Sequence, residues 1–123
     1  YLFAHNDGDG GFGTNGDQDI IKCGNYTGNG LADGPTVDLG WQPQWVLIKK
    51  TASGDSGNWY IFDSVRGVVT GSNDQYLSAN ATDIDQAASL IDFTSTGFKI
   101  TQAGNAGLNN GGIAFIYTAI RAA

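Results

Sequence analysis

Four aspartates near the N-terminus have the residue type and the spacing that suit a hard metal ion. Asp7 and Asp9 lie two positions apart, and Asp17 and Asp19 repeat that spacing after a Gly- and Asn-rich stretch. Ca²⁺ takes about six to eight oxygen ligands from flexible acidic loops. An EF-hand is absent, because Phe12 stands where its glycine belongs and no bidentate glutamate follows. The sequence therefore predicts an irregular calcium site at these four aspartates, with a solvated acidic turn as the alternative.

A second group of residues has chemistry that suits sugars. Trp41, Trp45 and Trp59 are all the tryptophans of the chain, and aromatic faces can stack on pyranose rings or pack in a core. Trp45 and Trp59 lie within apolar runs, so we expect them in the core. Trp41 precedes Gln42 and Pro43 and is the best candidate for an exposed ring, although packing in the core is favoured for it as well. Asp63 and Arg66 follow, and a guanidinium fork can orient a hydroxyl or a carboxylate. The predicted glycan site is Trp41, Asp63 and Arg66, although the charged pair is expected to be a structural ion pair.

Catalytic residues find less support. His5 is the single histidine and Cys23 the single cysteine, so a catalytic triad depends on His5 and a zinc site lacks ligands. Two carboxylates such as Asp63 and Asp92 can act on a glycosidic bond, but nothing in their spacing selects them. The glycine-rich stretches match no phosphate-binding motif. We therefore predict that the chain is not an enzyme.

Composition restricts the partners. The chain has 123 residues and a net charge of −6, which fits one domain over residues 1–123 and argues against a nucleic-acid partner. No apolar run is long enough to cross a bilayer, so membrane insertion is not expected. The chain opens at Tyr1 rather than Met. We expect it to be a domain of a longer protein, with residues 1–19 as a Gly/Asp-rich loop segment.

Short apolar runs separated by Gly, Asn and Asp turns predict strands, because these turn residues tolerate hairpin backbone angles. The run at residues 44–51 is apolar on both faces, which indicates the interior of a sandwich or a subunit contact. Residues 82–88 give at most one helical turn. The prediction is an all-β antiparallel β-sandwich or jelly-roll-like fold with about seven or eight short strands. The expected strands are residues 20–27, 36–39, 44–51, 58–63, 76–77, 90–93, 97–101 and 113–121.

Six segments in the same order resemble a known family. They are DQDIIKCGNYTGNG, VDLGWQPQWVLIKKT, NWYIFDSVRG, YLSANAT, LIDFTSTGFKI and GGIAFIYTAIR, within residues 17–121. Together they are similar to a domain of unassigned function that recurs in tail and fibre-associated proteins of tailed bacteriophages, many from marine and cyanobacterial hosts. The departures are small. Gln42 stands where the family often has an acidic residue, and Arg121 lacks a second basic residue after it.

The resemblance implies a non-enzymatic structural or adhesion module of a phage tail fibre, spike or related virion appendage. It implies an extracellular virion location, a homotrimer, other virion tail proteins as partners and contact with a host-surface polysaccharide. Two alternatives stay open. One is a carbohydrate-binding module of a secreted or surface protein. The other is a glycan depolymerase domain, which requires two carboxylates about 5–10 Å apart in a cleft.

Overall fold

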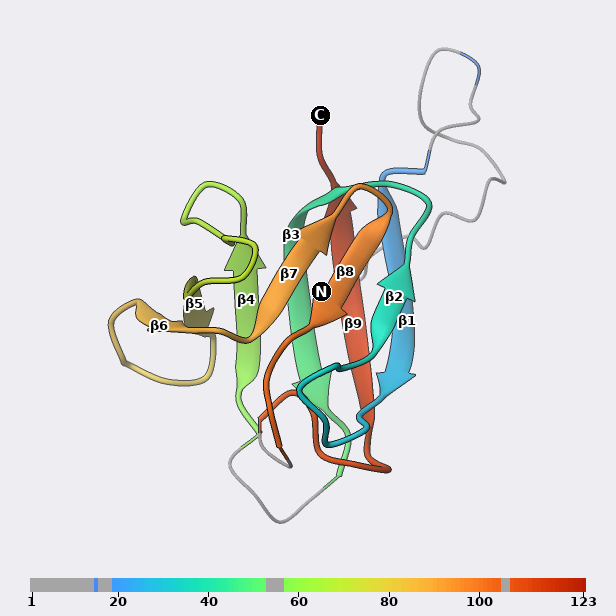
Figure 1. Cartoon of the computed structure of the whole chain (residues 1–123). Helices are drawn as coiled ribbons and strands as arrows, with labels where there is room; N and C mark the ends of the chain where they lie inside the picture. Colours follow the sequence, from blue (N-terminus) through green and yellow to red (C-terminus); the bar gives the residue numbers. More distant parts are fainter. Residues whose placement is uncertain (1–14, 16–18, 53–56, 105–106) are drawn as a thin grey trace.

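The structure is a computed structural model that describes residues 15, 19–52, 57–104 and 107–123. These residues form nine strands in two antiparallel sheets and contain no helix. The six-stranded sheet has the order β1 (Ile21–Thr27), β9 (Ala114–Arg121), β3 (Pro43–Lys50), β4 (Trp59–Asp63), β5 (Asp74–Ser78) and β6 (Gln86–Ala88). The three-stranded sheet has the order β2 (Thr36–Asp38), β8 (Gly97–Ile100) and β7 (Ile91–Thr94). Figure 1 shows the smaller sheet in front of β3, β9 and β1. The predicted all-β sandwich is confirmed.

The centre of the larger sheet is the antiparallel pair β3 and β9, flanked by β4 and β1. Val46 and Ile48 of β3 are fully buried, and they lie opposite Ala119 and Tyr117 of β9. Residues directly opposite each other in a sheet point to the same face. This register therefore directs one side of β3 into the core and leaves Trp45, Leu47 and Lys49 on the other side.

The core lies between the two sheets. The larger sheet contributes Phe62 and Phe115, and the smaller sheet contributes Ile91, Phe98 and Ile100, all fully buried. Aromatic rings join the layers: the ring centroids of Phe98 and Tyr117 are 5.3 Å apart in an edge-to-face contact. Buried aromatic pairs of this kind stabilise a core beyond the area that they bury.

Two buried polar side chains tie loops to the sheets. Asp74, at the start of β5, is fully buried and accepts hydrogen bonds from the backbone N–H groups of Val69, Leu90 and Ile91 at 3.1, 2.9 and 3.0 Å. It thereby joins the larger sheet to β7 of the smaller one. Because a buried charge needs several such bonds, this carboxylate is structural.

Asn109 is the second buried polar side chain, and its hydrogen bonds hold the loop that precedes β9. Its side chain is fully buried and accepts a hydrogen bond from the N–H of Asn29 at 2.9 Å. Its amide group donates to the carbonyls of Leu31 and Gln102 at 2.7 and 2.9 Å. One side chain thus fixes the loop before β9 to the loop after β1.

The segment predicted to contain a helical turn, residues 82–88, has no helix. Its last three residues form β6, which pairs with β5 through Asp74–Ala88, Gln75–Ala87 and Tyr76–Gln86. A single helical turn is costly to start because several residues must be ordered for one hydrogen bond. The free edge of β5 offers that segment regular backbone partners instead.

Candidate functional site

One face of the six-stranded sheet points away from the core, and we call it the outer face. The cross-strand registers place Ile120 beside Trp45, Thr118 beside Leu47, and Ile116 beside Lys49. They extend these rows to Ile21 and Cys23 on β1, and to Ile61, Trp59 and Leu77 on β4 and β5. The rows are therefore mostly apolar. The smaller sheet packs on the opposite face, where the core lies.

The most exposed large apolar side chains of the outer face lie in one row, near the end of β3 and the start of β4. Ile116 is 46% exposed and Trp59 is 41% exposed, and Lys49 lies between them in the same row. A small hollow of about 40 Å³ opens at this place. Its lining includes Leu47 and Thr118 as well. The outer face thus has projecting side chains and a depression beside them.

Lys49 is the cation of this row, and its charge is turned toward the sheet margin. Its ammonium group donates hydrogen bonds to the backbone carbonyls of Lys50 and Gly57 at 3.0 and 2.9 Å. Long lysine side chains commonly lay their methylene stem on apolar surface while the ammonium group stays polar. Lys49 therefore adds apolar area to the outer face.

Asp63 and Arg66 form the ion pair that the sequence predicted as structural. Their side chains are 3.3 Å apart, and the same carboxylate accepts a hydrogen bond from the backbone N–H of Arg66 at 2.7 Å. The Arg66 guanidinium also lies 3.5 Å from Asp85. Both contacts hold the turn after β4, so the guanidinium is already neutralised by two carboxylates.

The exposures of the tryptophans differ from the prediction. Trp41 is 7% exposed and belongs to the core cluster, so it packs in the core and is not an exposed ring. It lies in the connection from β2 of the smaller sheet to β3 of the larger sheet, and packing in the core cluster buries the ring. The prediction that Trp59 lies in the core is wrong, because Trp59 is the first residue of β4 and points to the outer face. Trp45 is on the outer face too, half-buried by its neighbours.

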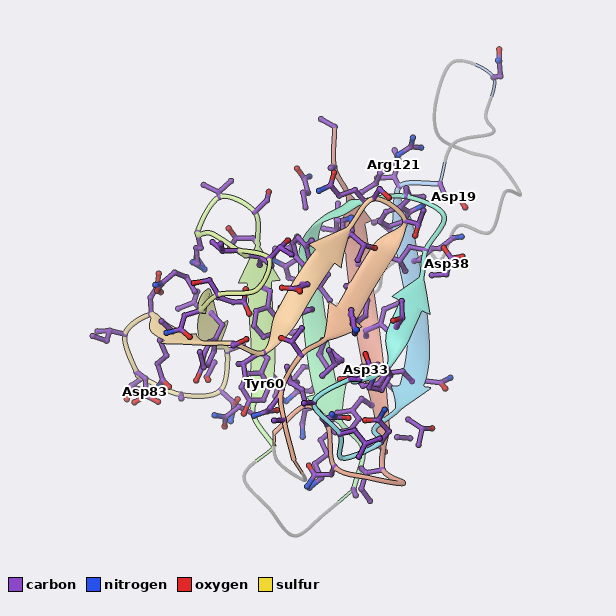
Figure 2. All side chains as sticks on the ribbon, viewed as in Figure 1. Asp19, Asp33, Asp38, Tyr60, Asp83 and Arg121 are labelled. Carbon is purple, nitrogen blue, oxygen red and sulfur yellow. The ribbon has the colours of Figure 1, made fainter. Side chains whose placement is uncertain are left out.

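Of the four predicted calcium ligands, Asp19 alone lies in the described part of the chain. Asp7, Asp9 and Asp17 lie outside the described residues, and Asp19 lies 3.3 Å from the ammonium group of Lys22. Figure 2 shows Asp33, Asp38 and Asp83 at separate places on the surface. Among the described residues no three His, Cys, Asp or Glu side chains form a group that could hold a metal ion. The calcium site stays a prediction.

Several ionisable groups outside these clusters have shifted pKa values, and each shift has a simple physical cause. The Lys99 ammonium donates to Asp33 and holds the pKa of that exposed carboxyl below its usual value. Burial raises the pKa of Tyr26 and, with smaller contributions from neighbouring charges, the pKa values of Tyr60, Tyr76 and Tyr117. Neither effect produces the matched acid and base of a catalytic centre.

His5 lies outside the described residues. The thiol of Cys23 is 3.5 Å from the hydroxyl of Thr118 on the neighbouring strand. In the described residues no helix is long and apolar enough to span a membrane.

The geometry defines a small β-sandwich module whose main surface feature is an apolar sheet face. The chain belongs to the family described as a domain of unknown function, DUF7483, whose model matches residues 17–122. No curated protein and no solved structure matches the chain.

The sequence contained part of the signal for the outer face. Residues 44–51 are apolar on both sides, and that pattern pointed to a sandwich interior or a subunit contact. Ile116 on β9 and Ile61 on β4 were not recognised as their neighbours, because cross-strand register depends on the order of strands in the sheet. The buried roles of Asp74 and Asn109 had no local signal in a chain rich in turn-forming Asp and Asn.

Proposed function

We propose that this domain is a non-enzymatic structural and adhesion module of a phage tail fibre, spike or related virion appendage. It works outside the cell, as part of a homotrimer and in contact with other tail proteins. The observation that supports an assembly role is the apolar outer face, on which Trp59 and Ile116 are 41% and 46% exposed. The resemblance of six segments to domains of phage tail proteins supports the virion setting.

The distribution of exposed apolar side chains strengthens the assembly role. Leu31, Val65 and Ile84 are more exposed than Trp59, but each lies outside the strands. Single exposed apolar residues are normal on soluble proteins, whereas contiguous apolar patches mark interaction sites. The outer face is such a patch, because its members are neighbours on adjacent strands.

Immunogold labelling of purified particles tests the virion assignment. Antibodies raised against the domain are applied to particles of the phage whose genome encodes it, and pre-immune serum is the control. We expect gold on the tail or its fibres. Particles that remain unlabelled, although a Western blot detects the protein in the infected-cell lysate, exclude the domain from the virion.

Contact with a host-surface glycan is the second candidate, and the exposure of Trp59 beside Lys49 and Thr118 favours it. An exposed indole face can stack on a sugar ring while neighbouring polar groups take its hydroxyls. A glycan array with host polysaccharides is expected to give signals that Trp59→Ala removes and Val65→Ala retains. A signal that survives Trp59→Ala excludes this surface as the sugar site. A carbohydrate-binding module of a secreted protein would give the same result on the glycan array. It would differ in the immunogold experiment, because the particles would remain unlabelled.

A further inference from the structure

The outer face is large enough to be an interface. Five strands contribute to it, β1, β9, β3, β4 and β5. With strands about 4.8 Å apart and about six residues at about 3.3 Å each, it spans about 24 by 20 Å, or about 500 Å² in projection. Projecting side chains make the accessible area larger than this projected area. A standard interface buries about 800 Å² on each partner, so the outer face is of the required order.

Charge favours a second copy of this chain as the partner. The protein has a net charge of −6, so two copies repel each other unless their contact avoids carboxylates. On the outer face the charged side chains are Lys49, which is bonded to carbonyls, and Asp63, which is paired with Arg66. A strongly charged partner would find no complementary field there. A neutral apolar sheet face that matches itself is the better fit.

The opposite side of the sandwich supports the same choice by contrast. The registers put Asp38, Lys99 and Asp92 on the outward side of the smaller sheet, together with Thr36 and Thr94. Two copies that met through this side would bring carboxylates together without burying apolar area. A contact through the outer face of the larger sheet buries apolar area and does not bring unpaired carboxylates together.

The shape of the outer face, with projecting side chains beside a hollow, also suits the packing of one sheet on another. Packed sheets lie about 10 Å apart with interdigitating side chains. Ile116 and Trp59 project, and the hollow of about 40 Å³ lies beside them. Each copy therefore supplies both projecting groups and a depression, so the projecting groups of one copy can enter the depression of the next copy in a closed ring.

We infer that the outer face of the six-stranded sheet is the contact between copies of this chain, with Ile116 and Trp59 as its most exposed large apolar side chains. The inference rests on the proposed function and names the partner of that surface. In a trimeric appendage, three such faces surround the shared axis and exclude water from it.

Sedimentation equilibrium of the whole chain over a range of micromolar concentrations tests the contact. We expect masses that rise above the 12.9 kDa of one copy toward an integral multiple. Ile116→Lys should weaken self-association by about 30-fold or more, since an uncompensated buried charge is strongly unfavourable. Ile84→Lys is the matched control, because Ile84 is 87% exposed and lies outside the outer face. It should leave the association unchanged.

A constant mass of one copy overturns the inference, and so does association that Ile116→Lys leaves intact. If that variant does not fold, hydroxyl-radical footprinting of the unaltered chain decides. Oxidation of Trp59 and Ile116 should fall with rising protein concentration, while oxidation of Val65 should not. Equal oxidation at all concentrations also overturns the contact. A monomer that still labels virions refutes this inference alone, whereas a self-associating chain absent from virions refutes the proposed function.

Discussion

At the scale of single residues, the fold depends on polar side chains that are buried with full sets of partners. Asp74 is the clearest case, because one carboxylate satisfies three backbone N–H groups from two separate segments. Buried donors that lose an acceptor retain the full cost of their desolvation. The carboxylate therefore matters more to stability than an ion pair at the surface, such as Lys99 with Asp33.

Asp74→Asn is expected to lower the free energy of unfolding by about 2–4 kcal/mol, because the amide has one acceptor oxygen where the carboxylate has two. Urea unfolding followed by circular dichroism measures the loss. Asp83→Asn is the matched control, since Asp83 is exposed and should change stability by less than about 0.5 kcal/mol. Equal losses for both variants would show that the buried network is not what stabilises this region.

Residue type and spacing alone could not separate Asp74 from the other aspartates, or Trp41 from Trp59. The chain has 12 acidic residues, and a buried acceptor is recognised only when the donors from distant segments are in place. The Asp63 and Arg66 pair was predictable because its members are local in sequence. Trp41 and Trp59 exchanged their expected environments because the position of the second sheet decides which side of a strand is covered.

At the scale of elements, the strands were the predictable part. The turn signals and apolar runs located β3, β4, β8 and β9 to within one residue at each end. β6 was missed because a three-residue strand exists only through its pairing with β5. Local propensity is a weak guide for so short a segment.

The edge strand β2 depends on close contact with β8, and Gly97 makes that contact possible. A Cβ atom at Gly97 would collide with the carbonyl oxygen of Val37 and lie 3.0 Å from its carbonyl carbon and 3.1 Å from the Leu39 nitrogen. Those atoms are backbone, so the strands themselves must move apart. Gly97→Ala is expected to cost about 1–3 kcal/mol, in the range of other overpacked sites.

Hydrogen exchange identifies where that cost arises. Protection of the β2 and β8 amides should fall in Gly97→Ala while protection in β3 and β9 changes little. Thr96→Ala is the control, because Thr96 is exposed in the adjoining turn. A uniform fall across both sheets would instead mean that the substitution lowers global stability without releasing β2.

At the scale of the whole molecule, two sheets of unequal size explain both the core and the outer face. The three-stranded sheet packs on one side of the six-stranded sheet, so the strands that are apolar on both faces retain one apolar side that it does not cover. The strand order β1-β9-β3-β4-β5-β6 joins residues from both ends of the chain. Such an order is set by global packing, which is why the sequence predicted the sandwich but not the composition of this face.

The tyrosines between the layers give the whole fold a dependence on alkaline pH. Burial raises the pKa of Tyr26 above its ordinary value of about 10, and its hydroxyl donates to the carbonyl of Leu108 at 2.9 Å. The pKa values of Tyr60, Tyr76 and Tyr117 are raised as well. A group with a higher pKa in the folded state holds its proton there while the unfolded chain has already lost it. Stability is therefore full below about pH 10 and falls as the pH rises further.

Thermal unfolding followed by circular dichroism should show a midpoint that changes little from pH 8 to pH 9 and drops steeply above about pH 10. Tyrosinate absorbance should rise together with unfolding, because Tyr26 cannot ionise in the core without losing its packing. Tyr26→Phe separates this effect from general alkaline damage. It lowers stability near neutral pH, since the Leu108 carbonyl loses its donor, but it makes the alkaline decline shallower. A decline of the same steepness in Tyr26→Phe would assign the effect to the other tyrosines or to the lysines. A flat midpoint through pH 11 would contradict the burial of Tyr26 and the partial burial of the other three rings.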